Sequence, residues 1–243
     1  KSDIQDMSFR KFSSFAFQVR GVTFDIKSGK TTAIVGESGC GKTVTAKALM
    51  GLIHRPGKVL EESQILFKGK DIINLSKKEK NEFCGKECSM IFQDALVSLN
   101  PTMKIGKQIT ENLTNHNKSI PKKELKRKAT EMLQLVEIPD AEKCLEKYPH
   151  ELSGGMRQRA ALIRTLALKP DLLLLDEPFS ALDHQTRLMV CDDISSILRK
   201  NGKTAILVTH DLSEAISFAD RIIVLTPRPG RIRTVLYLFF PDD

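Results

Sequence analysis

The sequence predicts an α/β fold in which a block of helices is inserted into a core of alternating strands and helices. Short apolar runs of strand length alternate with helix-prone stretches in both the N-terminal and the C-terminal part of the chain. Between these parts, residues 94–163 have a mostly helical pattern. Ahead of the first core strand, residues 4–30 alternate apolar and polar side chains, which is typical of a small antiparallel sheet. The expected core is therefore a parallel sheet that carries two additional parts.

Each element of this fold follows from hydrophobic periodicity and from the residues that interrupt it. The predicted strands are 31–35, 64–70 with its turn, 89–93, 172–176, 204–209 and 221–225. The predicted helices are 45–50, 76–82, 105–113, 124–136, 154–168, 185–200 and 213–219. Pro121 and Pro139 bound the fourth of these helices because proline cannot continue one. Ser153 is placed as the N-cap of the fifth.

Composition limits the class of protein. With 243 residues, 41% of them hydrophobic, the chain can bury a sizeable core. Five cysteines without framework spacing indicate a reducing compartment, and Cys84 and Cys88 alone are a weak metal motif. We see no apolar run of bilayer-spanning length and no signal peptide. Because Lys1 is not a natural start, we expect the chain to be trimmed from a longer one.

The formal net charge of +8 allows two interpretations. A nucleic-acid partner is one, but no nucleic-acid-binding motif accompanies the charge. A solvated basic surface together with a phosphate site is the other, and we favour it. Residues 122–128 illustrate it, since this lysine-rich run has the pattern of a helix face turned to water.

The strongest motif is Gly36–Thr43, which follows the P-loop pattern G-x-x-x-x-G-K-[ST]. A predicted strand leads into it and a predicted helix follows, so backbone N–H groups and a helix N-terminus point at one spot. A chance match in a glycine-rich turn would lack that context. We expect Lys42 to bind the β- and γ-phosphates of a nucleoside triphosphate and Thr43 to bind Mg²⁺. The other predicted nucleotide-binding residues here are Gly36, Glu37, Ser38, Gly39, Cys40, Gly41 and Thr45.

Two adjacent carboxylates, Asp176 and Glu177, end the apolar strand Leu172–Leu175. Alone they could equally be an ordinary acidic strand terminus. Beside a P-loop, a strand-end aspartate holds Mg²⁺ directly or through water. The following carboxylate can orient or deprotonate the water that attacks the γ-phosphate.

Polar residues also end two other predicted core strands. Gln93 ends the strand before the helical block, where its amide could sense Mg²⁺ or the attacking water. His210 follows the strand 204–209, and in a parallel sheet this position faces the ligand crevice. From there, His210 could bond the γ-phosphate and hold Glu177 in place.

A second anion site is predicted where Ser153-Gly154-Gly155 opens a helix with exposed N–H groups. One nucleotide occupies one P-loop. We therefore expect this second surface to serve a nucleotide bound to another molecule.

In these motifs and their order, the chain resembles the nucleotide-binding subunits of ABC transporters over nearly its whole length. The matching segments are the Walker A motif at 36–43, the Q-loop at Gln93, the signature at 152–158, the Walker B motif at 172–177, the D-loop at 180–183 and the switch histidine at His210. The resemblance implies a P-loop NTPase core of the RecA-like type with an antiparallel β subdomain. It implies one nucleotide-binding domain, 1–243, with a core of 1–93 and 164–243 and a helical subdomain of 94–163.

The resemblance also implies partners. Two such subunits, identical or different, form a head-to-tail dimer with two ATP molecules between the P-loop of one and the signature of the other. Hydrolysis reopens the dimer and drives the membrane permease subunits, which an extracytoplasmic binding protein supplies with substrate. The chain would then lie at the cytoplasmic face of the membrane as a peripheral subunit, without a nucleic-acid partner.

Single residues receive roles from the same resemblance. Glu177 is the general base, and His210 clamps the γ-phosphate. The residues implied to serve Mg²⁺ are Thr43, Gln93 and Asp176. Those implied to act on the partner's ATP, or to link the two sites, are Ser153, Gly154, Gly155 and Asp183. Residues 93–112 are implied to form the groove for a helix of the permease. Phe12 is our choice for the aromatic that stacks on adenine, with Phe9 and Phe15 as alternatives that could equally be strand core.

Finer resemblance points to importers. Residues 93–101, 55–58 and 148–151 resemble the oligopeptide, dipeptide and nickel importer ATPases. Residues 176–180 and 227–232 instead resemble nitrate, sulfonate or taurine importer ATPases, and we expect the chain to lack the C-terminal extension usual in the peptide class. The predicted substrate class, taken from the first of these resemblances, is peptide or a metal such as nickel.

Three rival functions are distinguishable. A soluble ABC ATPase acting on DNA or ribosomes would carry two cassettes or a long coiled-coil insertion, and this sequence has neither. A P-loop kinase or GTPase would lack the signature, and no N/T-K-x-D guanine motif is present. An ABC exporter often has a fused membrane domain, although its membrane subunit can be encoded separately.

Overall fold

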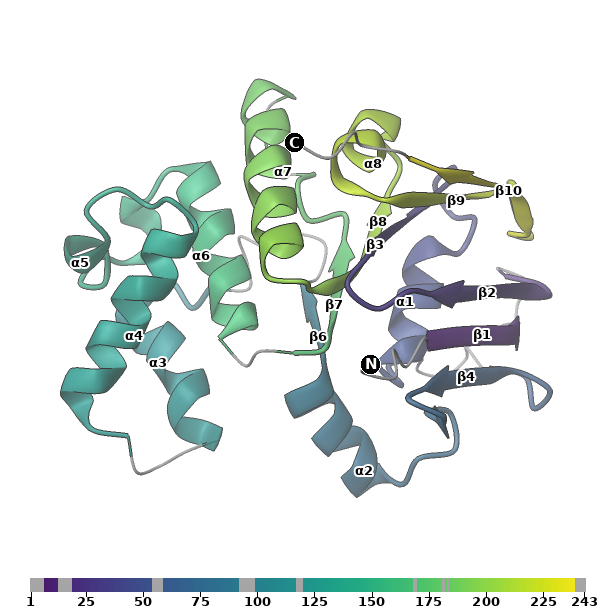
Figure 1. The fold of residues 1–243 in the computed structure, drawn as a ribbon, viewed down its shortest axis with the longest axis horizontal. Coiled ribbons are helices and arrows are strands. Elements are labelled where there is room, and N and C mark those ends of the chain that lie inside the picture. The colour runs from purple at the N-terminus through teal and green to yellow at the C-terminus, as the bar shows by residue number, and fades with distance from the viewer. Residues whose placement is uncertain are drawn as a thin grey trace.

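The core of the molecule is a six-stranded sheet with the strand order β10-β9-β3-β8-β7-β6 (Figure 1). This computed structural model describes residues 7–12, 19–53, 59–91, 99–116, 120–167, 170–180, 182 and 184–238. The strands are β3 (Thr31–Val35), β6 (Cys88–Ile91), β7 (Leu172–Asp176), β8 (Thr204–Thr209), β9 (Arg221–Leu225) and β10 (Ile232–Tyr237). All neighbouring pairs are parallel except β9 and β10. The carboxyl ends of β3, β7 and β8 therefore meet at one edge.

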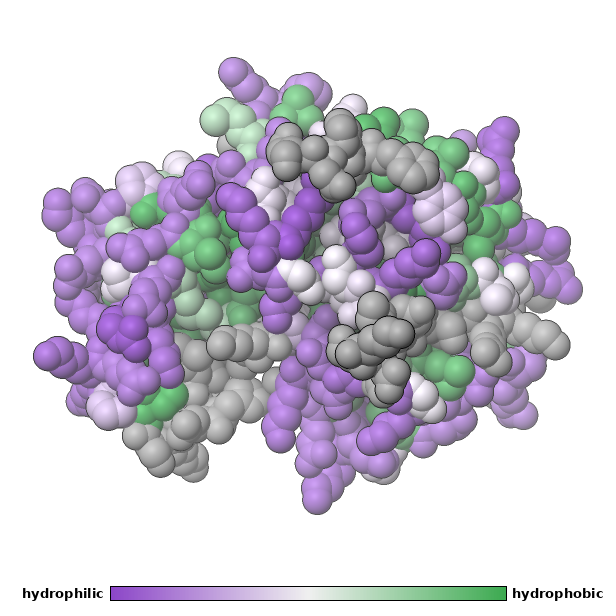
Figure 2. Space-filling view, viewed as in Figure 1, coloured by the Kyte–Doolittle hydropathy of each residue, from purple (hydrophilic) through white to green (hydrophobic). Residues whose placement is uncertain are grey.

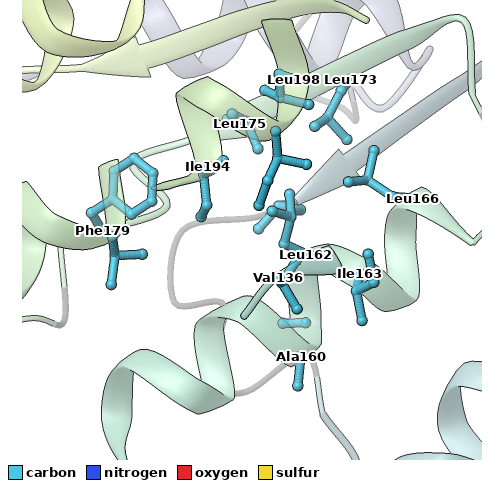
Figure 3. Packing of buried hydrophobic residues seen from close by; sticks show 14 of the residues in the cluster. Val136, Ala160, Leu162, Ile163, Leu166, Leu173, Leu175, Phe179, Ile194 and Leu198 are labelled. Atoms are coloured by element: carbon cyan, nitrogen blue, oxygen red, sulfur yellow. The ribbon is translucent and has the colours of Figure 1, made fainter. Parts of the chain in front are cut away.

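The two faces of this sheet belong to two hydrophobic clusters, because side chains alternate along a strand. In β7, Leu173 and Leu175 pack with the helices α6 (Gly154–Leu166) and α7 (His184–Lys200). Figure 3 shows this packing around Leu162 and Ile194. Leu172 and Leu174 join the other cluster, together with α1 (Lys42–Leu49) and the antiparallel strands. A strand buried on both faces explains the unbroken leucine run.

A second, antiparallel sheet has the order β2-β1-β4-β5. It is built from β1 (Met7–Phe12), β2 (Val22–Ile26), β4 (Gln64–Phe67) and β5 (Lys70–Asp71). The predicted antiparallel sheet is confirmed, but strands from beyond the P-loop complete it. In Figure 1 this sheet lies on the opposite side of the molecule from α3 (Ile105–His116), α4 (Lys122–Leu135) and α5 (Ala141–Cys144).

The remaining helices are short. They are α2 (Lys77–Glu82) and α8 (Leu212–Phe218), with a π-helical turn at Phe83–Glu87 and a 3₁₀ turn at Pro149–Glu151. Ser76 and Glu79 form a capping box at the start of α2. None of the helices within the described ranges is long and apolar enough to cross a membrane.

The predicted fold class is confirmed, and four core strands have the predicted bounds. Two predictions need correction. The helix after the P-loop begins at Lys42, three residues before the predicted start, because Gly41 caps it in the left-handed region at a φ of 103°. The strand β10 was not predicted, since it is an edge strand with largely exposed side chains and charged Arg233 inside it.

The helix α6 joins the helical block to the core. The predicted border between residues 163 and 164 lies inside α6, which packs on β6 and α7 as well as on α3 and α4. Figure 2 shows hydrophobic residues in the hollow between the helical block and α7, where Met132, Leu135 and Ile197 lie. The two parts of the molecule thus share one apolar cluster.

Candidate functional site

The P-loop connects β3 to α1 and is shaped by glycines. Gly39 and Gly41 adopt φ values of 80° and 103°, which side chains with a Cβ rarely adopt. At Gly36, a Cβ would lie 2.8 Å from Cys40 Sγ and 3.1 Å from the Leu225 carbonyl oxygen. Cys40 is fully buried, so its thiol packs beneath the loop. The loop backbone can therefore fold closely around a small anion.

Two side chains of α1 bond the loop itself. Lys42 is 4% exposed, and its ammonium donates to the carbonyl oxygens of Gly36 at 2.7 Å and Glu37 at 3.0 Å. Its charge is thus held beside the loop N–H groups, where a phosphate would be bound. Thr45 is 2% exposed, and its hydroxyl donates to the Gly41 carbonyl at 3.0 Å. Its side chain supports the first turn of α1 from within.

Thr43 and Asp176 bring the P-loop to the end of β7. The Thr43 hydroxyl donates to Asp176 Oδ1 at 2.9 Å. Asp176 is buried. Burial raises the pKa of its carboxyl, while the hydrogen bond from Thr43 and the charge of Lys47 offset part of this rise. A buried carboxylate of this kind favours a nearby cation.

The donor pair fits Mg²⁺. Two oxygens bound about 2.1 Å from one octahedral Mg²⁺ lie about 3.0 Å apart, close to the separation of Thr43 Oγ1 and Asp176 Oδ1. Mg²⁺ at phosphate sites uses one or two protein oxygens, with phosphate and water as the other ligands. Within the described ranges, no three His, Cys, Asp or Glu side chains gather as a metal site, and the pair Cys84 and Cys88 is not part of one.

Glu177 and His210 meet at the carboxyl ends of β7 and β8. Glu177 Oε1 lies 3.4 Å from His210 Nδ1, with side-chain exposures of 17% and 55%. The Glu177 backbone is left-handed, with a φ of 45°, although its N–H still donates to the Val208 carbonyl at 2.8 Å. Left-handed backbone at a non-glycine residue costs free energy and is often found at functional sites. This bend turns the chain out of the sheet directly after Asp176.

The loop after Glu177 is anchored in the core by Phe179. This side chain is 1% exposed and stacks at a tilt on Phe218, with ring centroids 5.8 Å apart. Figure 3 shows Phe179 in the apolar cluster near Ile194. The position of Glu177 is therefore set by a buried aromatic two residues further on.

The start of α6 carries the second predicted anion site. Ser153 is the N-cap, as predicted, and its hydroxyl oxygen accepts from the Met156 N–H at 3.3 Å. Ser153 is exposed, Gly154 is half-buried and Gly155 is buried. The predicted residues thus form the N-terminus of a helix, and its N-cap, Ser153, is exposed to solvent.

Sequence reasoning missed Gln158, which lies on the buried face of α6. It is 3% exposed, and its Nε2 donates to the Pro178 carbonyl at 2.9 Å. A glutamine in the apolar stripe of α6, four residues before Leu162, was the available signal. Gln158 joins the helix of the signature motif to the residue after Glu177.

Several predicted site residues cannot be placed. Gln93, Asp183 and Phe15 lie outside the described residues, as does part of the predicted groove 93–112. Phe9 and Phe12 belong to β1, but their side chains are not described. Their roles stay predictions.

A P-loop between a parallel strand and a helix, facing two carboxylates at the end of another strand of the same sheet, defines a P-loop nucleotide-binding fold. The comparisons with known proteins identify the family. The ABC transporter family model matches residues 19–180, and the chain therefore belongs to this family.

The chain is similar to curated transport proteins. It is 45% identical over 225 residues to the oligopeptide transport ATP-binding protein OppD of Bacillus subtilis, covering 92% of this chain and 63% of OppD. It is 42% identical over 219 residues to the dipeptide transport ATP-binding protein DppD of Lactococcus lactis, covering 90% of this chain and 62% of that protein. The chain thus spans less than two thirds of the length of these relatives.

Solved structures share the fold. The dimeric structure of MJ0796, a bacterial ABC transporter cassette, superposes with a TM-score of 0.79 at 24% identity, covering 96% of this chain and 99% of MJ0796. A post-hydrolysis dimer of MJ0796 bound to ADP and phosphate gives a TM-score of 0.78 with the same coverage. At this identity the likeness concerns the fold.

Proposed function

We propose that this chain is the ATP-binding and ATP-hydrolysing subunit of a membrane ABC importer for peptides, peripheral to the cytoplasmic face of the membrane. The observation that carries the proposal is the meeting of Thr43 with Asp176 and of Glu177 with His210 at the edge next to the P-loop. The peptide class is supported by the oligopeptide and dipeptide transport proteins to which the chain is similar. These relatives favour peptide over nickel as the substrate.

The residues of the chain divide the work of hydrolysis. Lys42 and the P-loop N–H groups would bind the phosphates of ATP. Thr43 and Asp176 would hold Mg²⁺, which neutralises charge on the β- and γ-phosphates when bound. Glu177 would orient the attacking water and accept its proton. His210, 3.4 Å from Glu177, would bond the γ-phosphate and fix the carboxylate.

The second half of each site would come from another cassette. The exposed Ser153 and the N–H groups of Gly154 and Gly155 would contact ATP held by the P-loop of the partner. Asp183 would link the two sites, and Gln93 would complete the Mg²⁺ site. Permease subunits would dock on the helical block, in the groove that residues 93–112 are proposed to form.

Glu177→Gln tests the proposal. The variant keeps the shape of the side chain and loses the base, so we expect ATP binding to persist while hydrolysis falls by about 100-fold or more. ATP should then trap a dimer, which size-exclusion chromatography with and without ATP would detect. Glu82→Gln, an exposed glutamate on α2, is the matched control and should behave as the unchanged chain.

Two results would contradict the proposal. Full turnover by Glu177→Gln would remove Glu177 as the base. A hydrolysis rate per molecule that does not change on dilution to a monomer would remove the need for a second cassette.

A further inference from the structure

Arg187 occupies an unfavourable position for a cation. It lies in the first turn of α7, where the partial positive charge of the helix N-terminus repels it. No acidic residue shares that turn. A reason for arginine at this position must therefore come from outside the helix.

The contacts of Arg187 supply that reason. Its Nη2 donates to the Leu182 carbonyl oxygen at 2.9 Å. Its Nη1 lies 3.4 Å from Asp211 Oδ2, and its Nε lies 3.6 Å from Glu214 Oε1. The Arg187 side chain is 19% exposed and that of Glu214 is 4% exposed. One guanidinium thus connects the loop before α7 with the start of α8.

Both acidic partners of Arg187 form a hydrogen bond with Thr209, the residue before His210. The Thr209 hydroxyl donates to Glu214 Oε2 at 2.5 Å and accepts from the Asp211 N–H at 3.0 Å. Asp211 in turn caps α8, accepting from the N–H groups of Ser213 and Glu214. The residues on both sides of His210 are therefore held by groups that contact Arg187.

The other end of the guanidinium holds the loop that begins at Glu177. Within this loop the Ser180 N–H donates to the Glu177 carbonyl, and the Leu182 N–H donates to the Phe179 carbonyl. Arg187 bonds the carbonyl at the far end, at Leu182. The segment carrying Glu177 and the segment carrying His210 thus contact one partly buried cation.

We propose that Arg187 is a positioning residue for ATP hydrolysis: it sets the distance between Glu177 and His210 by joining their two segments. This inference rests on the proposed ATPase function. Arg187 itself touches neither Glu177 nor the nucleotide in this role. Its loss should lower kcat and leave the KM for ATP nearly unchanged, because the P-loop contacts stay intact.

Arg187 has a second possible role, as a counter-charge for Asp211 and Glu214, which must be distinguished from positioning. Burial raises the pKa of Glu214, and the bond from Thr209 and the charge of Arg187 offset part of that rise. Burial alone would also raise the pKa of Asp211, but the Ser213 and Glu214 N–H groups and the Arg187 guanidinium hold it below its usual value. Arg187 could thus act only as a counter-charge that stabilises the fold.

Three variants distinguish positioning from charge compensation. They are Arg187→Met, the double variant Arg187→Met/Glu214→Gln, and the control Arg199→Met at the exposed far end of α7. The assays are steady-state ATP hydrolysis by the full chain with its co-purifying subunits, and thermal unfolding. We expect Arg187→Met to lower kcat by about 10- to 100-fold with KM within about twofold, since misplacement by about 1 Å has costs of this order.

The double variant decides between the roles. Removing both charges should restore the melting temperature toward that of the unchanged chain, while kcat stays low. A double variant with normal kcat would overturn the proposal and leave Arg187 as a counter-charge. So would normal kcat in Arg187→Met itself.

Hydrogen exchange in the ATP-free chain separates this proposal from the ATPase assignment. We expect Arg187→Met to exchange faster than Arg199→Met in peptides covering 177–182 and 207–213. Equal exchange would overturn the proposal even if the unchanged chain hydrolysed no ATP. An unchanged chain without ATPase activity but with the expected exchange difference would contradict only the proposed function.

Discussion

The P-loop and the start of α6 are both glycine-rich helix N-termini, yet the chain completes only one of them. At the P-loop, the Lys42 ammonium bonds two loop carbonyls and Thr43 bonds Asp176, so the positive charge and the proposed metal ligands both come from within the chain. At α6, Ser153 accepts a single N–H at 3.3 Å and faces outward. The P-loop is held together by side chains of this chain, whereas the N–H groups at the start of α6 are proposed to bind a nucleotide held by a second cassette.

This difference predicts which substitutions should alter nucleotide binding by the isolated chain and which should alter only hydrolysis by the proposed dimer. Changes at the P-loop should weaken nucleotide binding by the isolated chain. Changes at the start of α6 should leave that binding intact and lower hydrolysis. Gln158 connects α6 to the loop that begins at Glu177, because its side chain bonds the Pro178 carbonyl.

The largest effect is expected from Lys42→Ala. The variant loses charge-assisted hydrogen bonds to phosphate, each contributing about 1.5–3 kcal/mol, so ATP affinity of the isolated chain should fall by about 10- to 100-fold. Isothermal titration calorimetry would measure it. Lys77→Ala, an exposed lysine on α2, should bind as before. Equal affinities for the two variants would remove Lys42 from the phosphate site.

A matched pair of glycine variants tests the comparison directly. In Gly36→Ala the new Cβ would lie 3.1 Å from the Leu225 carbonyl, so the loop must shift, at a cost of about 1–3 kcal/mol in stability. In Gly154→Ala the Cβ meets, among the described residues, only Leu182 Cδ2 at 3.4 Å, so the fold should tolerate it. Gly154→Ala should therefore bind ATP normally as a monomer and hydrolyse it slowly. Chemical denaturation, ATP titration and rate measurements would show both outcomes, and reduced monomer affinity in Gly154→Ala would contradict the comparison.

A smaller effect is expected from Gln158→Met, which keeps the size of the side chain. The Pro178 carbonyl loses its buried donor, and the free energy of unfolding should fall by about 1–3 kcal/mol. Gln134→Met, at an exposed position near the end of α4, should change it by less than about 0.5 kcal/mol. Urea denaturation of both variants would compare them. Equal stabilities would show that the hydrogen bond from Gln158 to Pro178 contributes nothing net to the free energy of unfolding.

The smallest effect is expected from Asp176→Asn in the presence of a chelator, and it is a gain rather than a loss of stability. Burial raises the pKa of Asp176, so its ionised form destabilises the ATP-free fold, and the uncharged amide should stabilise the fold slightly at neutral pH. This gain should shrink as the pH falls through the titration of Asp176, because the protonated carboxyl carries no such penalty. Thermal unfolding across this pH range would measure it. A gain that grows toward acid pH would contradict the assignment.

Much of the site could be predicted because its residues are neighbours in sequence. The pattern of Gly36–Thr43 needs only a strand before it and a helix after it, and both are present. Asp176 and Glu177 follow an apolar strand whose four leucines are buried. Arg187 could not be assigned a role in the same way, since its partners Asp211 and Glu214 lie beyond another strand.

The sequence by itself determined the periodicities of the strands and helices, the order of the motifs and the family to which the chain belongs. These depend on short-range sterics and on consecutive residues, which a linear pattern records. Only the tertiary structure placed Thr43 against Asp176, which are 133 residues apart, and tied the loop after Glu177 to α6 and α7. Such contacts depend on how strands pair and helices pack, and no local pattern specifies them.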